Sequence, residues 1–96
     1  MAAATRLGDN DTGNDACPAT ALNSASGNVI INSRGAGRVN DSYVAHSCIA
    51  HGSHSGVIAS GSANVFINGR AAGRIGDPVS CGGSVAEGSV NVFIGG

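Results

Sequence analysis

The chain has 96 residues with 16 glycines, one tyrosine, two phenylalanines and no tryptophan, so a single domain must build its core from small side chains. The formal net charge is −1 and all basic side chains are arginines inside one repeated motif, which excludes an electrostatic nucleic-acid binder. No apolar run reaches the roughly 20 residues of a membrane-spanning helix, and the start does not resemble a secretory signal.

A repeated unit organises the whole chain. Residues 6–9 carry only its second half, and residues 28–41 hold the first complete copy. Residues 64–77 hold the next complete copy, 36 positions later, and residues 91–96 carry its first half alone. We expect the two partial copies to complete each other, so that residues 1–96 form one domain of three units.

Each unit is typical of β structure. It opens with Asn-Val followed by Ile or Phe, a short β-branched run that favours a strand. Asn68-Gly69 then predicts a hairpin turn, and the Arg-x-x-Asp segment that ends the unit is expected to return as a strand. The density of glycine disfavours long helices. Further strand-like stretches are expected at residues 56–62 and 83–89, and irregular loops at residues 17–22 and 41–56.

The arginines and aspartates of the repeat have a simple structural interpretation. The aspartate caps a turn, and the arginine crosses the surface to pair with it. A catalytic role would need a cleft and an acid/base partner, and the sequence indicates neither.

The histidines are confined to one loop, at positions 46, 51 and 54, with Cys48 between them. Cys81 lies in the corresponding loop of the next unit, so the two loops should converge on one end of a three-unit fold. Imidazole and thiolate ligands suit a closed tetrahedral zinc site, with iron as the alternative. Because no export signal is apparent, disulfides are disfavoured. We therefore predict one structural metal ion, which would add folding energy that the small core lacks.

Enzymatic activity finds little support in the sequence. Residues 52–56 look superficially like a nucleophile elbow, but His54 occupies the nucleophile position. Residues 82–86 depart from the same pattern by one residue and lack the helix that must follow it. Glu87, the only glutamate, lies in an expected strand and is not beside the histidines. We therefore expect no enzyme. The alternatives are a self-standing Ser/Asn/Gly-rich β-solenoid that binds surfaces and, less favoured, a small metal hydrolase.

Residues 66–77 resemble the Pro-Ala-Ala-Arg motif region of PAAR-repeat proteins, and residues 81–83 and 88–96 fit the same family. Ala71 and Gly35 replace the proline of the motif. The resemblance implies an all-β cone of short strands, built from three pseudo-threefold repeats with a metal at the apex. Its base would cap a trimeric β-helical spike of a contractile phage tail or a type VI secretion system. The location would be the tail baseplate of a virion or, alternatively, the type VI secreted spike, and a target membrane would be met only transiently.

The resemblance also implies an apical ligand set of three histidines and one cysteine. Three positions match, namely His46, His54 and Cys81. Asn14 stands where relatives have a further histidine. His51, Cys17 or a water molecule would complete the set, and we favour His51, with zinc preferred over iron. The face toward the spike is expected to be made by Val29, Ile31, Val65, Ile67, Val92 and Ile94.

Overall fold

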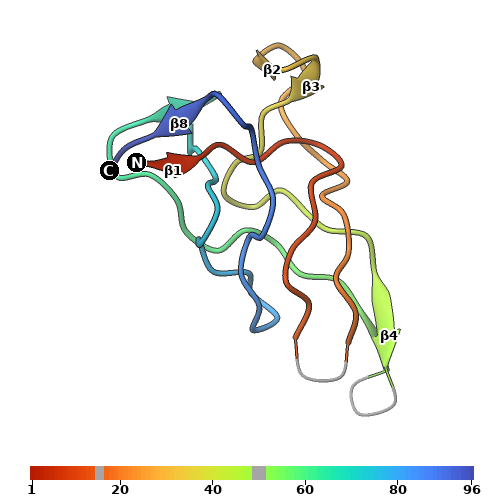
Figure 1. The fold of residues 1–96 in the computed structure, drawn as a ribbon. Helices are drawn as coiled ribbons and strands as arrows, with labels where there is room; N and C mark the ends of the chain where they lie inside the picture. Colours follow the sequence, from red (N-terminus) through yellow and green to blue (C-terminus); the bar gives the residue numbers. More distant parts are fainter. Residues whose placement is uncertain (15–16, 49–51) are drawn as a thin grey trace.

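The computed structural model describes residues 1–14, 17–48 and 52–96 of the chain (Figure 1). Within these ranges every regular element is a short strand, as the all-β prediction requires, and there is no helix long and apolar enough to cross a membrane. The strands are β1 (Ala2–Ala3), β2 (Ile30–Ile31), β3 (Arg34–Gly35), β4 (His46–Cys48), β5 (Gly52–His54), β6 (Phe66–Ile67), β7 (Arg70–Ala71) and β8 (Phe93–Ile94).

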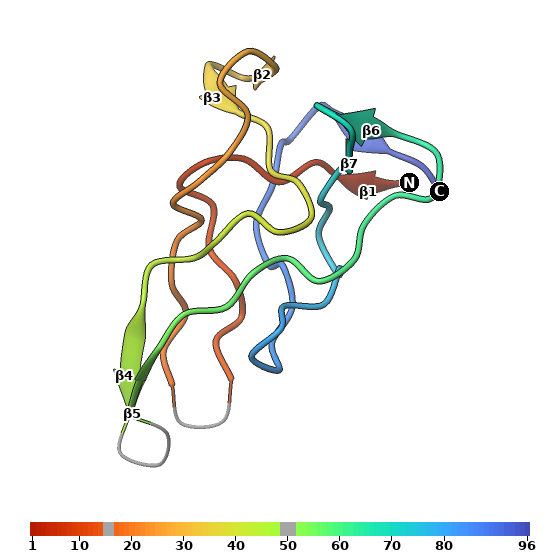
Figure 2. The same cartoon turned by 180° about the vertical axis from the view of Figure 1, so that it is seen from behind.

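Three antiparallel pairs are equivalent to one another by the repeat. β2 pairs with β3, β6 pairs with β7, and β1 pairs with β8, so the third pair joins the first and last strands of the chain. Figures 1 and 2 show the two termini side by side next to this pair. The partial copies therefore complete each other, as predicted, and three units surround a pseudo-threefold axis.

The two continuous hairpins have the same turn. Asn68 and Gly69 have φ angles of 53° and 76°, and Asn32 and Ser33 have φ angles of 52° and 70°. Positive φ at both central residues is the type I′ geometry of two-residue hairpins, which confirms the hairpin predicted at Asn68-Gly69. Because such a turn lets pairing resume at once, β3 and β7 are the returning strands. The prediction that the Arg-x-x-Asp segments return as strands is wrong.

The Arg-x-x-Asp segments form tight turns instead. In each, the aspartate amide donates to the carbonyl of the arginine three residues earlier, over 2.9–3.0 Å. The carboxylate accepts hydrogen bonds from the backbone and guanidinium of the same arginine, and these bonds raise the pKa of the guanidinium. The third turn residue has positive φ, which glycine and asparagine tolerate best. It is Gly8, Asn40 and Gly76 in the three units.

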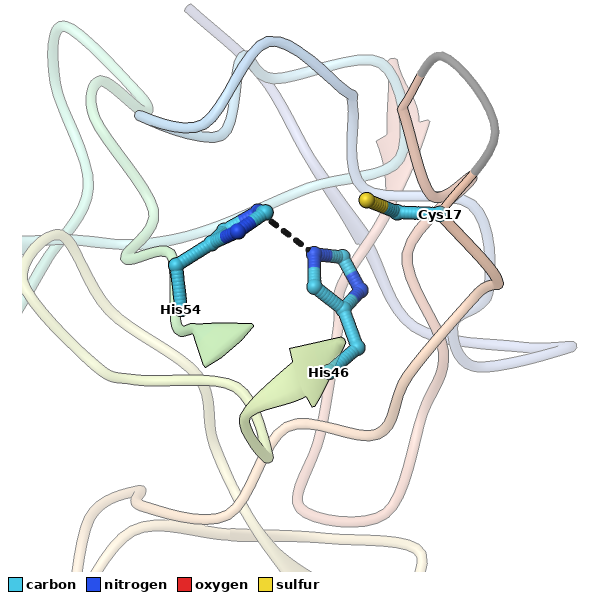
Figure 3. A group of neighbouring side chains, drawn as sticks. All are labelled: Cys17, His46 and His54. Carbon is cyan, nitrogen blue, oxygen red and sulfur yellow. Dashed lines mark hydrogen bonds between the residues drawn. The ribbon is translucent and has the colours of Figure 1, made fainter. Parts of the chain in front are cut away.

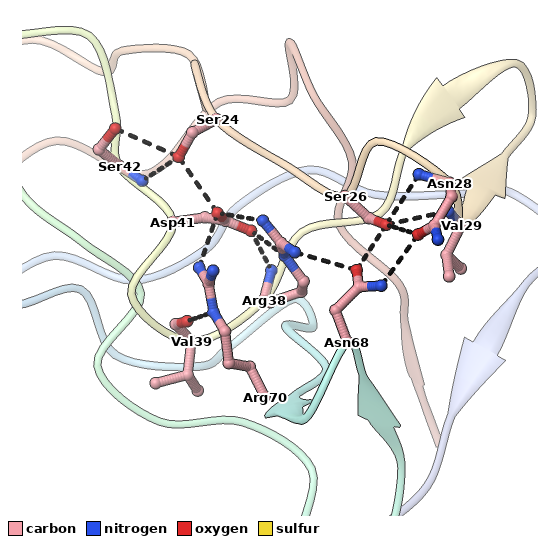
Figure 4. Close-up of polar contacts among 10 residues, drawn as sticks. All are labelled: Ser24, Ser26, Asn28, Val29, Arg38, Val39, Asp41, Ser42, Asn68 and Arg70. Atoms are coloured by element: carbon pink, nitrogen blue, oxygen red, sulfur yellow. Dashed lines mark hydrogen bonds and ion pairs between the residues drawn. The ribbon is translucent and has the colours of Figure 1, made fainter.

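Two of these aspartates also tie neighbouring units together: Asp9 pairs with Arg34 at 3.3 Å, and Asp41 makes the more extensive contacts shown in Figure 4. The buried carboxylate of Asp41 pairs with Arg38 of its own turn and with Arg70 of the next unit, each at 2.8 Å. The side chain of Asn68 accepts from Arg38 at 3.0 Å and from the Ser26 hydroxyl at 2.7 Å. A buried, multiply bonded carboxylate therefore holds the second and third units in register.

A ring of backbone hydrogen bonds joins the units at the pseudo-threefold axis. The amide of Thr5 donates to the carbonyl of Gly73 at 3.1 Å, Gly73 donates to Gly37 at 2.9 Å, and Gly37 donates to Thr5 at 2.9 Å. Space at the axis is limited, because a β-carbon on Gly37 would lie 2.7 Å from Thr5 Cγ2. The buried threonine side chain thus occupies room that the two glycines leave.

The core consists of two small apolar clusters. The first takes one alanine and one isoleucine from each unit: Ala4, Ala36, Ala72, Ile31, Ile67 and Ile94. The second holds Leu22, Tyr43, Ile58, Val79 and Val85. The molecule is elongated, with extents of 37 × 24 × 22 Å. The three equivalent strand pairs, two of which are hairpins, lie at one end and β4–β5 at the other (Figures 1 and 2).

The region expected to be an irregular loop between Asp41 and Gly56 contains the β4–β5 hairpin, so that prediction is wrong. Its residues are polar and small, and the alternation that predicts strands is absent from them. The expected strands at residues 56–62 and 83–89 are reduced to single bridges, such as Ile58 with Val79 and Val85 with Asp11. Pairing across units, rather than a regular ladder, holds these stretches.

Candidate metal centre

Three potential metal ligands meet at the β4–β5 end of the molecule. His46 and His54 lie directly opposite each other on the two strands, and Cys17 approaches from the N-terminal loop, where it bridges back to Asn14. One sulfur and two ring nitrogens lie within 4.8 Å of one another (Figure 3). Cys17 is 5% exposed and His46 is 7% exposed, so two of the three groups are buried.

The hydrogen bonds of His46 define its tautomer. Its Nδ1 lies 2.9 Å from the carbonyl oxygen of Pro18, and a carbonyl can only accept, so Nδ1 carries the proton. In the neutral ring Nε2 then presents a lone pair. His54 Nε2 lies 2.8 Å from that atom and donates to it. Histidines that bind metals commonly donate one ring N–H to a carbonyl in this way, which orients the ring and leaves the other nitrogen free for the metal.

The donor set fits a small, borderline-soft cation. Two imidazole nitrogens and one thiolate are ligands of structural zinc, and a tetrahedral zinc ion would separate two nitrogens by about 3.3 Å. The observed 2.8 Å between His46 and His54 is close to that value. The hairpin therefore needs only a small opening, together with transfer of the His54 proton from Nε2 to Nδ1.

Cys17 is disulfide-bonded in this structure, contrary to the expectation that disulfides are disfavoured. A sulfur in a disulfide is no thiolate ligand, so Cys17 offers its sulfur to a metal only after reduction.

The structure brings together two of the predicted ligands and adds one. His46 and His54 are in the group, as expected from the sequence. Cys17, which the sequence offered only as an alternative, is the third member. Cys81 is not in this group. It is a free, half-buried cysteine packed against the second apolar cluster, while His51 lies outside the described residues.

Cys17 could have been found from one sequence signal. It follows Asn14, the position of the missing histidine, by only three residues, so the two must lie close together. In the structure the Cys17 amide donates to the Asn14 carbonyl at 2.7 Å. The side chain of Asn14 instead donates to the Cys81 carbonyl at 2.7 Å, which ties the first loop to the third.

The opposite end of the molecule presents apolar side chains, and the residues predicted to face a spike lie there partly in the core and partly at the surface. Ile31, Ile67 and Ile94 are 9%, 7% and 7% exposed and belong to the core. Their strand neighbours point outward, because successive side chains of a strand alternate between faces. The outward residues are Ile30, Phe66 and Phe93, with exposures of 56%, 61% and 52%. Of the three predicted valines, Val29 and Val65 are exposed and Val92 packs partly against the core.

Fold and site together define a small three-unit β domain, with apolar hairpins at one end and a candidate metal centre at the other. The chain belongs to the PAAR motif family, whose family model matches residues 12–87. Proteins of this family are structural tips on the spikes of contractile injection systems. No curated protein matches the chain in sequence.

Proposed function

We propose that this chain caps the end of a trimeric β-helical spike and forms its sharpened tip. The observation that carries the proposal is the pseudo-threefold body: three equivalent strand pairs at one end, each presenting one large exposed apolar residue. A single chain with three quasi-identical units matches the end of a threefold spike, where one cap meets three subunits.

Docking would remove two unfavourable surfaces from water. The end of a β-helical trimer exposes unpaired strand edges, which invite aggregation unless they are covered. The cap exposes Ile30, Phe66 and Phe93, whose burial is worth roughly 25 cal/mol per Å². Ile31, Ile67 and Ile94 support this face from beneath. The cap and the spike would thus stabilise each other, and the cap would transmit force along the spike axis.

Phe66→Asp is expected to weaken binding to the trimeric spike protein of the same injection system about 100-fold, because a charge replaces a central apolar anchor. Ile30→Asp and Phe93→Asp should act in the same direction. Calorimetric titration of the purified spike trimer measures the effect. Val44→Asp is the matched control, because Val44 is 45% exposed but lies beside β4 at the other end. Equal losses for Val44→Asp and Phe66→Asp would refute the docking face.

We further propose that Cys17, His46 and His54 hold one structural metal ion, with zinc favoured over iron, when Cys17 is reduced. The ion would crosslink the N-terminal loop to the β4–β5 hairpin, since Cys17 lies on the first segment and His46 and His54 on the second (Figure 3). Such a crosslink stiffens the tip against bending at impact. A ligand at 1,000 times its dissociation constant stabilises a fold by about 4 kcal/mol.

Removing one imidazole is expected to lower zinc content at least tenfold. Elemental analysis of His46→Ala and His54→Ala, purified under reducing conditions, checks this result, together with the loss of zinc-dependent thermal stabilisation. Cys81→Ser should retain zinc, because Cys81 is outside the cluster. His51→Ala tests the alternative ligand suggested by the sequence. Full zinc binding by both His46→Ala and His54→Ala would disprove the centre.

A further inference from the structure

We infer that the tip carries a redox-controlled metal centre, in which a disulfide at Cys17 and a metal ion exclude each other. This inference rests on the proposed metal centre and adds a condition to it. Two observations combine: Cys17 is disulfide-bonded, and the same sulfur lies within 4.8 Å of the ligand nitrogens of His46 and His54. One sulfur therefore belongs to both arrangements, and its oxidation state decides between them.

The surroundings of Cys17 suit both states. The residue is 5% exposed, and its backbone amide donates to the carbonyl of Asn14 at 2.7 Å, which holds the main chain of Cys17 beside the two histidines. The two imidazoles pair with each other at 2.8 Å in the disulfide form, so their ring nitrogens at the shared point do not depend on a metal for hydrogen bonding. The cluster is thus satisfied without an ion and already arranged to accept one.

The chemistry of the exchange balances with a dithiol as reductant. Dithiothreitol transfers two electrons and two protons to the disulfide, the S–S bond breaks, two cysteine thiols form, and the dithiol becomes a cyclic disulfide. The Cys17 thiol then loses its proton to solvent when its sulfur binds the cation. In the reverse direction, oxidised glutathione takes two electrons from the two thiols and becomes two glutathione thiols. The protein regains its S–S bond and the cation leaves.

As a consequence, the kind of crosslink at the tip depends on whether the surrounding compartment is reducing or oxidising. Under reducing conditions the N-terminal loop and the β4–β5 hairpin are joined through a metal. Under oxidising conditions Cys17 remains tethered by its covalent bond, while His46 and His54 lose their thiolate partner. Two histidines alone bind zinc far more weakly than two histidines together with a cysteine thiolate.

The test compares one preparation of the wild-type chain in two redox states. The protein is reduced with dithiothreitol or oxidised with oxidised glutathione, freed of both reagents without air, incubated with equal zinc, and analysed by native mass spectrometry. Thiol titration confirms each state. We expect zinc on the reduced chain and at least tenfold lower occupancy on the oxidised chain, restored when dithiothreitol is added back. No variant is needed, so a folding defect cannot obscure the result.

Two outcomes overturn the inference in distinguishable ways. Equal zinc occupancy in both states refutes mutual exclusion but leaves the metal centre standing. Absence of zinc from the reduced chain refutes the metal centre and this inference with it. Cys81→Ser should behave as wild type in both states, since Cys81 is a free cysteine outside the cluster. If Cys81→Ser bound zinc equally in both redox states, the switch would depend on Cys81, and its assignment to Cys17 would be wrong.

Discussion

Replacing Asp41 with alanine is expected to lower the free energy of unfolding by about 3 kcal/mol, mainly because it leaves the Arg38 guanidinium, on a side chain only 11% exposed, without its counter-charge, while Arg70 is partly screened by solvent. The Asp41 carboxylate is 2% exposed and pairs with Arg38 and Arg70, each at 2.8 Å. It also accepts from the Ser24 hydroxyl at 3.2 Å. Such a loss is a large part of the roughly 5–15 kcal/mol that stabilises a typical domain. Urea unfolding followed by circular dichroism measures it.

The repeat supplies an internal control for this prediction. Asp77 is the equivalent aspartate of the next unit and pairs with Arg74 at 2.9 Å. Ala2 stands where the other units carry Arg34 and Arg70, so the structure gives Asp77 no second arginine within its described residues. Asp77→Ala should therefore cost clearly less than Asp41→Ala. An equal or greater cost at Asp77 would contradict the role of Asp41 as the link between units.

Substitution of Gly37 by valine is expected to destabilise the fold by about 2–3 kcal/mol through overpacking at the pseudo-threefold axis. A β-carbon at this position would lie 2.7 Å from Thr5 Cγ2 and 2.8 Å from Leu22 Cδ2. Both neighbours are buried and have little room to move away. Thermal and urea denaturation measure the loss. Gly27→Val is the control, because a β-carbon on Gly27 meets nothing within 4 Å.

A double-mutant cycle isolates the axial contact. Thr5→Gly removes the nearest obstructing methyl group, so the pair Thr5→Gly with Gly37→Val should be more stable than the two single losses added together. A coupling of about 1 kcal/mol or more is expected for residues in direct contact. Strictly additive losses would show that the axis is not where the valine clashes.

The site shows what local sequence signals can and cannot locate. His46 and His54 were identified because they cluster in one loop and metal chemistry requires such donors. The two histidines come together on a hairpin whose sequence lacks the alternation of apolar and polar residues that predicts strands. Cys17 reaches them only through the path of the N-terminal loop. For the same reason the sequence does not separate Ile30 from Ile31: both are equally apolar, so composition cannot show which one faces outward. In the folded protein Ile31 packs against Ala36 in the core, and Ile30 therefore faces outward.

The sequence by itself determined that three similar units form one small β domain, because a repeat with an Asn-Gly turn constrains each unit locally. It also determined that the first and last segments belong together, since each lacks the half that the other has. Only the tertiary structure decided which sulfur joins the histidines, which apolar residues face outward and how Asp41 and the axial ring lock the units. Those features depend on contacts between residues far apart in the chain, where distance and available space select the partner and local preference has no influence.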